Sequence, residues 1–141
     1  MKKVAKNFIF ILLIFTFFCL FYINVPKVSV PFKTAGVEYY YKNGSHGAIK
    51  LVDKKNGLLN FNKKGEAYLL SEYLDACTVL DYYGAKVISI EESAWGVSVY
   101  AYSEEIKYIK EINDKKINVH LHYDKSNGQV KIGFPMIYGS F

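Results

Sequence analysis

The chain contains no arginine, because all eighteen of its basic residues are lysines. Arginine provides the planar, two-pronged donor group that reads phosphates and guanine edges, so its absence removes the commonest specific contact with nucleic acid. After residue 25 the chain carries fifteen lysines against thirteen acidic residues, a balance of +2. This part therefore lacks the electrostatic attraction that drives binding to a phosphate backbone, and we expect no nucleic-acid partner.

Cysteine is also scarce: Cys19 lies inside an apolar run, and Cys77 is the one cysteine outside it. A single cysteine cannot form an internal disulfide, so packing alone must hold the fold. The helical pattern described below puts Cys77 in an apolar stripe, where a small buried side chain is expected. We interpret Cys77 as a packing residue and keep a nucleophilic role beside a histidine as the alternative.

The sequence has one long apolar run instead, from Phe8 to Val25, in which only Thr16, Tyr22 and Asn24 carry a polar side-chain atom. Eighteen helical residues span about 27 Å, close to the thickness of a bilayer's hydrocarbon core. Lysines at positions 2, 3 and 6 favour a cytoplasmic N-terminus, and no small-residue cleavage site follows the run. The sequence predicts a signal-anchor transmembrane helix over residues 1–25; cleavage would instead give a secreted protein.

The rest of the chain divides into a linker and one domain. Residues 26–35 include Pro26 and Pro31 and predict a short extended stalk. Residues 36–141 suffice for one domain with a modest core. We expect this domain to be extracytoplasmic, in a single-pass protein that is attached to the cell membrane through residues 8–25.

Three strands are predicted at the start of the domain. Val37–Lys42 is rich in aromatic residues, and a cluster of turn residues separates it from a second strand, Ala48–Val52. The sequence Lys55-Asn56-Gly57 is typical of a tight turn before a third strand, Leu58–Phe61. The expected arrangement is a three-stranded meander.

A helix is predicted from Glu66 to Tyr83. Apolar residues recur there at helical spacing, and Gly84 stands where a helix would end. The stripe on this helix would pack against a sheet; its members are Leu69, Leu70, Tyr73, Leu74, Cys77, Val79, Leu80 and Tyr83.

Period-two alternation follows. Val87–Glu91 and Trp95–Tyr102 predict a β-hairpin that points Trp95 to the core and Tyr100 and Tyr102 to the opposite face. Ser103 would then cap a short helix over residues 104–111.

Ile106 and Ile109 are the expected buried pair of that short helix. A second hairpin follows, with strands Ile117–Tyr123 and Val130–Phe134 around the turn Asn127-Gly128. These elements predict an α+β domain: an antiparallel sheet of two or more hairpins with one amphipathic helix packed on one face, preceded by the transmembrane helix.

Four segments also carry a family resemblance: Gly84–Val87, Trp95–Ser103, Lys115–Val119 and Lys131–Ile137. Over roughly residues 64–141 they resemble the C-terminal half of YwmB-like proteins. Those proteins are secreted or membrane-associated proteins of endospore-forming Firmicutes with a TATA-box-binding-like fold. The resemblance implies the same fold, an envelope location and a link to sporulation, and it brings no catalytic residues.

His120 and His122 are the strongest candidates for metal chemistry. They are two residues apart on a predicted strand, so both leave the same face of the sheet. A catalytic zinc needs about three protein ligands, and the neighbours Asn118 and Asp124 on this face offer no third soft ligand. We therefore predict a solvated outer face for both histidines and expect no cofactor.

Tyrosine is the clearest surplus, with thirteen in the chain. Tyrosine is favoured at binding surfaces because it offers a large area with few rotatable bonds. We expect Tyr40, Tyr100 and Tyr102 to form a contact face. The sequence thus favours a non-enzymatic domain that binds an envelope protein or a cell-wall component. An envelope hydrolase or metal-dependent enzyme that uses His120 and His122 is the alternative.

Overall fold

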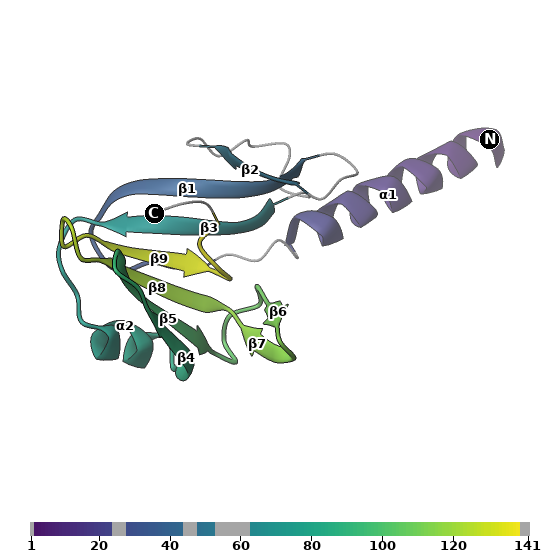
Figure 1. Cartoon of the computed structure of the whole chain (residues 1–141). Coiled ribbons are helices and arrows are strands. Elements are labelled where there is room, and N and C mark those ends of the chain that lie inside the picture. The colour runs from purple at the N-terminus through teal and green to yellow at the C-terminus, as the bar shows by residue number, and fades with distance from the viewer. Residues whose placement is uncertain (1, 24–27, 44–47, 53–62, 139–141) are drawn as a thin grey trace.

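A computed structural model describes residues 2–23, 28–43, 48–52 and 63–138 (Figure 1). Along the chain the elements in these residues are α1 (Lys2–Ile23), β1 (Thr34–Asn43), β2 (Ala48–Val52), β3 (Lys63–Leu70), α2 (Ala76–Tyr82), β4 (Lys86–Glu92), β5 (Gly96–Tyr102), β6 (Lys110–Ile112), β7 (Lys115–Ile117), β8 (Val119–Asp124) and β9 (Val130–Phe134).

Seven strands form one sheet in the order β2-β1-β3-β9-β8-β5-β4, and β6 pairs with β7. The neighbouring strands are antiparallel, so the α+β class is confirmed. The predicted hairpins β1–β2, β4–β5 and β8–β9 are confirmed as well. Leu58–Phe61, the predicted third strand of the meander, lies outside the described residues; β3 is the other neighbour of β1.

The helix predicted from Glu66 to Tyr83 is wrong in its first half, which belongs to β3. Residues 66–69 pair with β1 on one side and with β9 on the other. Hydrogen bonding to two neighbouring strands therefore outweighs the helical spacing of the apolar residues, since intrinsic propensity is a weak preference.

The second half of the prediction is confirmed as α2. The Asp75 carboxylate caps this helix by accepting a hydrogen bond from the Thr78 N–H at 2.9 Å. Gly84 follows the helix with a φ of +56°, the left-handed conformation that ends many helices.

The short helix predicted over residues 104–111 is wrong: residues 104–109 form a non-helical loop, and strand β6 begins at Lys110. Asn118 fixes this loop: its Nδ2 donates to the carbonyls of Ser103 and Ile106, and its Oδ1 accepts from the Ser103 N–H. Ile106 is buried as predicted, whereas Ile109 is 48% exposed. The fully buried amide thus takes the place of helical hydrogen bonds.

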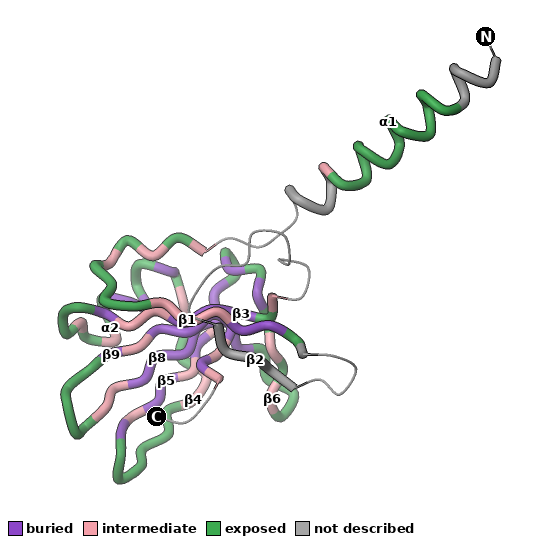
Figure 2. The backbone as a smooth tube through the Cα atoms, turned by 90° about the horizontal axis from the view of Figure 1, so that it is seen from above, coloured by how far each residue is buried: buried purple, intermediate pink, exposed green. Residues whose placement is uncertain are grey.

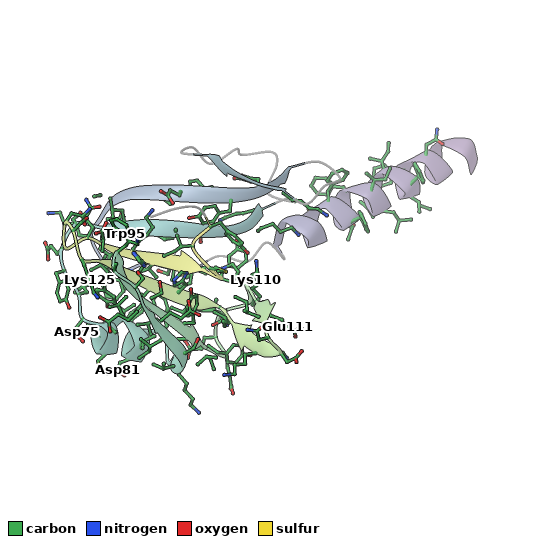
Figure 3. All side chains as sticks on the ribbon, in the orientation of Figure 1. Asp75, Asp81, Trp95, Lys110, Glu111 and Lys125 are labelled. Carbon is green, nitrogen blue, oxygen red and sulfur yellow. The ribbon has the colours of Figure 1, made fainter. Side chains whose placement is uncertain are left out.

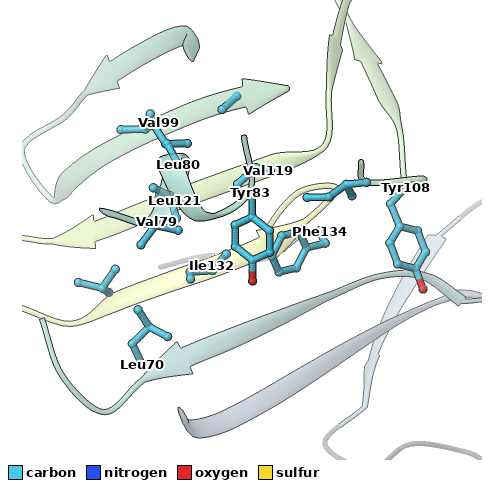
Figure 4. Packing of buried hydrophobic residues seen from close by; sticks show 13 residues of the cluster. Leu70, Val79, Leu80, Tyr83, Val99, Tyr108, Val119, Leu121, Ile132 and Phe134 are labelled. Atoms are coloured by element: carbon cyan, nitrogen blue, oxygen red, sulfur yellow. The ribbon is translucent and has the colours of Figure 1, made fainter. Parts of the chain in front are cut away.

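The core lies between α2 and one face of the sheet (Figure 4). Alternate residues of β5, β8 and β9 point to it, as period-two packing requires. Its fully or nearly buried members include Leu70, Val79, Leu80, Tyr83, Val99, Ala101, Val119, Leu121, Val130, Ile132 and Phe134.

Trp95 is not part of this core, and its predicted burial is wrong. It lies in the turn between β4 and β5 with 76% of its surface exposed (Figure 3). Its carbonyl accepts from the Lys125 N–H at 2.9 Å, and the Lys125 ammonium donates to Ser93 O at 3.1 Å. These two hydrogen bonds connect the β4–β5 turn to the β8–β9 turn, outside the packed core.

Part of the expected stalk packs onto the domain. Val28, Val30 and Phe32 lie against the core, and the Tyr83 hydroxyl donates to the Ser29 carbonyl at 2.9 Å. The Ser71 N–H also donates to a backbone carbonyl of this segment at 2.9 Å. In the structure, residues 28–33 are therefore the first packed segment of the domain.

Helix α1 points away from the sheet in both views (Figures 1 and 2). Its described side chains from Phe8 to Phe18 are exposed, and Thr16 Oγ1 donates to the Leu12 carbonyl at 2.7 Å. Within the described ranges, no helix combines the length and the hydropathy that crossing a bilayer requires.

Candidate functional site

The sheet face opposite α2 carries a polar row: Glu38 on β1, Lys131 on β9, His122 on β8 and Ser98 on β5. Lys131 lies opposite His122 in the register, and His122 lies opposite Ser98. The Lys131 ammonium donates to Glu38 Oε1 at 3.0 Å, and Ser98 Oγ is 3.0 Å from His122 Nδ1. Four side chains from four strands therefore form one connected polar row.

His120 is next to this row and is only 1% exposed, so its predicted solvent exposure is wrong. The Ile137 N–H donates to His120 Nδ1 at 3.1 Å. Burial lowers the pKa of His120 to about 3, which keeps the ring neutral at physiological pH.

The burial of His120 follows from the chain after β9, which passes over this face of the sheet. A Cβ on Gly133 would lie 2.6 Å from both the N and the Cγ1 of Ile137, so only glycine allows this close approach. The chain end is distant in sequence from His120, and the strand pattern around the histidine therefore gave no sign of it.

His122 is also buried, at 5% exposure, against the prediction. Gly96, which pairs with Asp124, makes room for the ring, because a Cβ there would lie 2.7 Å from His122 Nε2. Burial lowers the pKa of His122, while the carboxylate of Asp124 acts in the opposite direction.

The histidines do not assemble a metal centre with other described residues. These residues contain no group of three or more histidine, cysteine, aspartate or glutamate side chains that could hold a metal ion. One lone-pair position of His120 already accepts a backbone N–H. The metal-dependent alternative therefore finds no third ligand in the described part of the chain.

Cys77 is exposed on the first turn of α2, so its predicted burial is wrong. The helix begins about ten residues later than predicted and is short, and it turns Val79 and Leu80 to the core instead. Cys77 is thus not a packing residue of the core.

The three predicted contact tyrosines differ in their burial and do not form one contact face. Tyr40 is fully buried, with its ring edge-to-face against Tyr138 at 5.0 Å and its hydroxyl donating to Glu38 Oε2 at 2.9 Å. Burial raises its pKa. Tyr100 and Tyr102 are half-buried on β5. Tyr40 is therefore a packing residue, and the other two keep accessible surface.

Strand β4, at the open edge of the sheet that the described residues form, carries exposed apolar side chains. Val87 is 49% exposed and Ile90 is 62% exposed. Both lie on the α2 side of the sheet, since they pair with Ala101 and Val99 of the core. Tyr100 and Tyr102 lie on the opposite side, because they alternate with Val99 and Ala101 along β5. We call Val87 and Ile90, on one side of this edge, and Tyr100 and Tyr102, on the other side, the edge surface.

The sequence gave no sign of a buried ion pair between Lys63 and Glu66 on β3. Their side chains are only 6% and 4% exposed. The Lys63 ammonium lies over the rings of Tyr39, at 5.2 Å, and Tyr108, at 5.7 Å. Burial, followed by the nearby Glu66 charge, raises the pKa of Tyr108. The helix prediction placed Glu66 at the first residue of a helix instead.

Comparison of the chain with protein-family models, with curated protein sequences and with solved structures finds no match. The resemblance to YwmB-like proteins therefore stays a prediction.

Proposed function

We propose that this chain is a membrane-anchored, extracytoplasmic and non-enzymatic interaction domain of the cell envelope, which binds another envelope protein through the edge surface. The observation that supports this best is the exposure of Val87 and Ile90 on the open edge strand of the sheet. Exposed apolar surface of this kind is typical of interaction sites.

An open strand edge favours a protein partner over a cell-wall glycan. Among the described residues, β4 pairs with β5 on one side only and ends the sheet, so an extended segment of a partner can add to it as a further strand. The strand also carries Lys86, Glu91 and Glu92, and its register shifts between Val87 and Ser89. Charges and bulges disfavour unselective edge-to-edge pairing, so the edge would accept a complementary strand and reject others.

The membrane anchor in this proposal rests on the sequence. The apolar run from Phe8 to Val25 follows three lysines, which favours insertion with the N-terminus in the cytoplasm. Asn24 and Val25, the end of the run, lie outside the described residues. A link to sporulation rests only on the resemblance to YwmB-like proteins.

Site-specific photocrosslinking in the source cells tests the contact surface. We expect a photoreactive residue at Ile90 to give one discrete protein adduct, which Val87→Asp in the same chain abolishes. Ile109 is the matched control, because it is an exposed isoleucine at 48% exposure outside β4. The same adducts from both positions, or no adduct from Ile90, would contradict the proposed surface.

A hydrolase remains the second candidate because Ser98 Oγ lies 3.0 Å from His122 Nδ1. A hydroxyl within hydrogen-bond distance of an imidazole is the arrangement of a serine nucleophile and its base. Both side chains are nearly buried, at 8% and 5% exposure. Labelling by a fluorophosphonate that Ser98→Ala abolishes and Ser93→Ala leaves intact would support this candidate; absence of labelling would remove it.

A further inference from the structure

A pocket of about 310 Å³ opens where residues 28–29 cross the end of α2. This volume is at the small end of the range for ligand pockets, and it suits a headgroup or an amino-acid side chain. The pocket is distinct from the polar row and from the edge surface. Its lining residues are Val28, Ser29, Tyr82, Tyr83, Glu105 and Ile106.

Tyr82 and Tyr83 line the pocket, and a third aromatic ring, that of Phe32, packs against both of them. The rings of Tyr82 and Tyr83 are perpendicular, with centroids 4.9 Å apart. Phe32 packs edge-to-face on both of them, at 5.6 Å from Tyr82 and 6.4 Å from Tyr83. Tyr83 is fixed further by Phe134, at 5.2 Å, with which it lies in the core (Figure 4). The rings are thus held in place without a ligand.

Glu105 also lines the pocket, and its loop is held in place by hydrogen bonds. The Glu105 N–H donates to Ser103 Oγ at 3.2 Å, and that hydroxyl donates to the Tyr83 carbonyl at 2.5 Å. The loop that carries Glu105 is therefore hydrogen-bonded, through Ser103, to Tyr83 at the C-terminal end of α2. Asn118 fixes Ser103 from the other side.

The charge of the pocket is negative, because Glu105 is the one ionisable acid or base other than tyrosine among its lining residues. Tyr82 is 52% exposed, so part of its ring remains open to a ligand. The face of an aromatic ring carries partial negative charge and attracts a cation within about 6 Å of its centre. Rings and carboxylate together therefore favour a positively charged group on a small apolar stem.

We propose that this pocket binds an organic ammonium group, with Tyr82 facing the cation and Glu105 neutralising its charge. Such a group occurs on lipid headgroups and on amino side chains of peptides, and both share the chemistry that the pocket recognises. The proposal does not depend on the edge surface or on the membrane anchor.

Calorimetric titration of the full chain in uncharged maltoside micelles tests the ammonium site. The probe is choline, and its matched control is 3,3-dimethyl-1-butanol, the uncharged carbon analogue of the same shape. We expect saturable binding of choline and about tenfold weaker binding of the alcohol. Equal binding of the two compounds, or no saturation by choline up to roughly 50 mM, would overturn the proposal.

Matched variants distinguish a loss of choline binding at the pocket from a loss of the fold. We expect Glu105→Gln to weaken choline binding by about five- to tenfold, while Glu104→Gln, which changes a neighbouring acid outside the lining, leaves it unchanged. Tyr82→Phe should retain binding because it keeps the ring, whereas Tyr82→Leu should lose it. Equal affinities for Tyr82→Leu and the unchanged chain, both folded by circular dichroism, would overturn the assignment.

The source of the ammonium group is decided by a second pair of probes. Tighter binding of n-butylammonium than of choline would support an amino side chain as the natural ligand, and the reverse would support a lipid headgroup. Either order supports the ammonium site. Failure of both compounds to bind would overturn it, and it would leave the edge-surface proposal intact, because that proposal is tested by crosslinking at Ile90.

Discussion

The ring of Tyr100 is stacked on the ring of His120, with centroids 4.4 Å apart and planes 24° from parallel. Tyr100 keeps part of its surface exposed, while His120 beneath it is buried. A residue of the edge surface is therefore in direct contact with a titratable group in the interior. A change in the charge of His120 would therefore alter its stacking interaction with the Tyr100 ring.

The stability of the domain should fall in mild acid because of His120. Its pKa is lowered from 6.5 to about 3 in the folded chain, so below pH 6.5 the unfolded chain takes up the proton more readily. The stabilisation is complete above pH 6.5 and is lost as the pH falls toward 3. We expect a loss of about 2 kcal/mol between pH 7 and pH 5 from urea unfolding.

The control for this prediction is a pair of variants. His122 also has a lowered pKa and contributes in the same direction, so His122→Gln should keep most of the pH dependence. His120→Gln should remove most of it. An unchanged dependence in His120→Gln would mean that the burial of this ring does not govern acid stability.

Gly133→Ala should displace the chain end from the face opposite α2. The new Cβ would lie 2.6 Å from the Ile137 backbone N, which cannot move away without releasing His120. We expect a loss of about 2 kcal/mol in unfolding free energy. The pKa of His120, followed by NMR, should rise toward its ordinary value.

Gly36→Ala is the matched control, because nothing lies within 4 Å of a Cβ at that position. It should leave both the stability and the His120 titration unchanged. If Gly133→Ala behaved like Gly36→Ala, the close packing of the chain end on the sheet would be wrong.

Removing one partner of the Lys63–Glu66 pair should lower the free energy of unfolding strongly, whereas replacing both partners by apolar residues should lower it little. Removing one partner with Lys63→Met leaves the Glu66 carboxylate buried without its cation, and we expect a loss of about 3–5 kcal/mol. The double change Lys63→Met with Glu66→Leu should recover most of that loss, since a buried ion pair repays little more than its own desolvation. Urea unfolding of the three chains checks this. Equal losses in the single and double variants would contradict this prediction, because the loss would then not come from the unpaired Glu66 charge.

The parts of the fold that the sequence predicted correctly are those encoded by neighbouring residues. Asn127-Gly128 marks the β8–β9 turn, where Gly128 has a φ of +69°. The alternation of Val119 and Leu121 similarly fixes which face of β8 packs against the core on the α2 side. Such local signals do not depend on which other strands join the sheet.

The errors come from partners that are distant in sequence. Glu66 belongs to a strand because β1 and β9 flank it, and both strands lie more than twenty residues away. His120 is buried because Ile137 covers it, and Cys77 is exposed because α2 begins later than its apolar spacing suggests. The candidate site therefore depended on long-range packing, which the single sequence does not specify.

Thiol labelling of Cys77 is the most direct test of the central claim, that the domain is anchored outside the cytoplasm. Cys77 is exposed in the structure, whereas Cys19 lies in the apolar run that we propose to be in the membrane. A membrane-impermeant maleimide should therefore label the full chain in intact protoplasts, and Cys77→Ser should abolish the label. Labelling of Cys77 only after the protoplasts are lysed would place the domain in the cytoplasm and contradict this account.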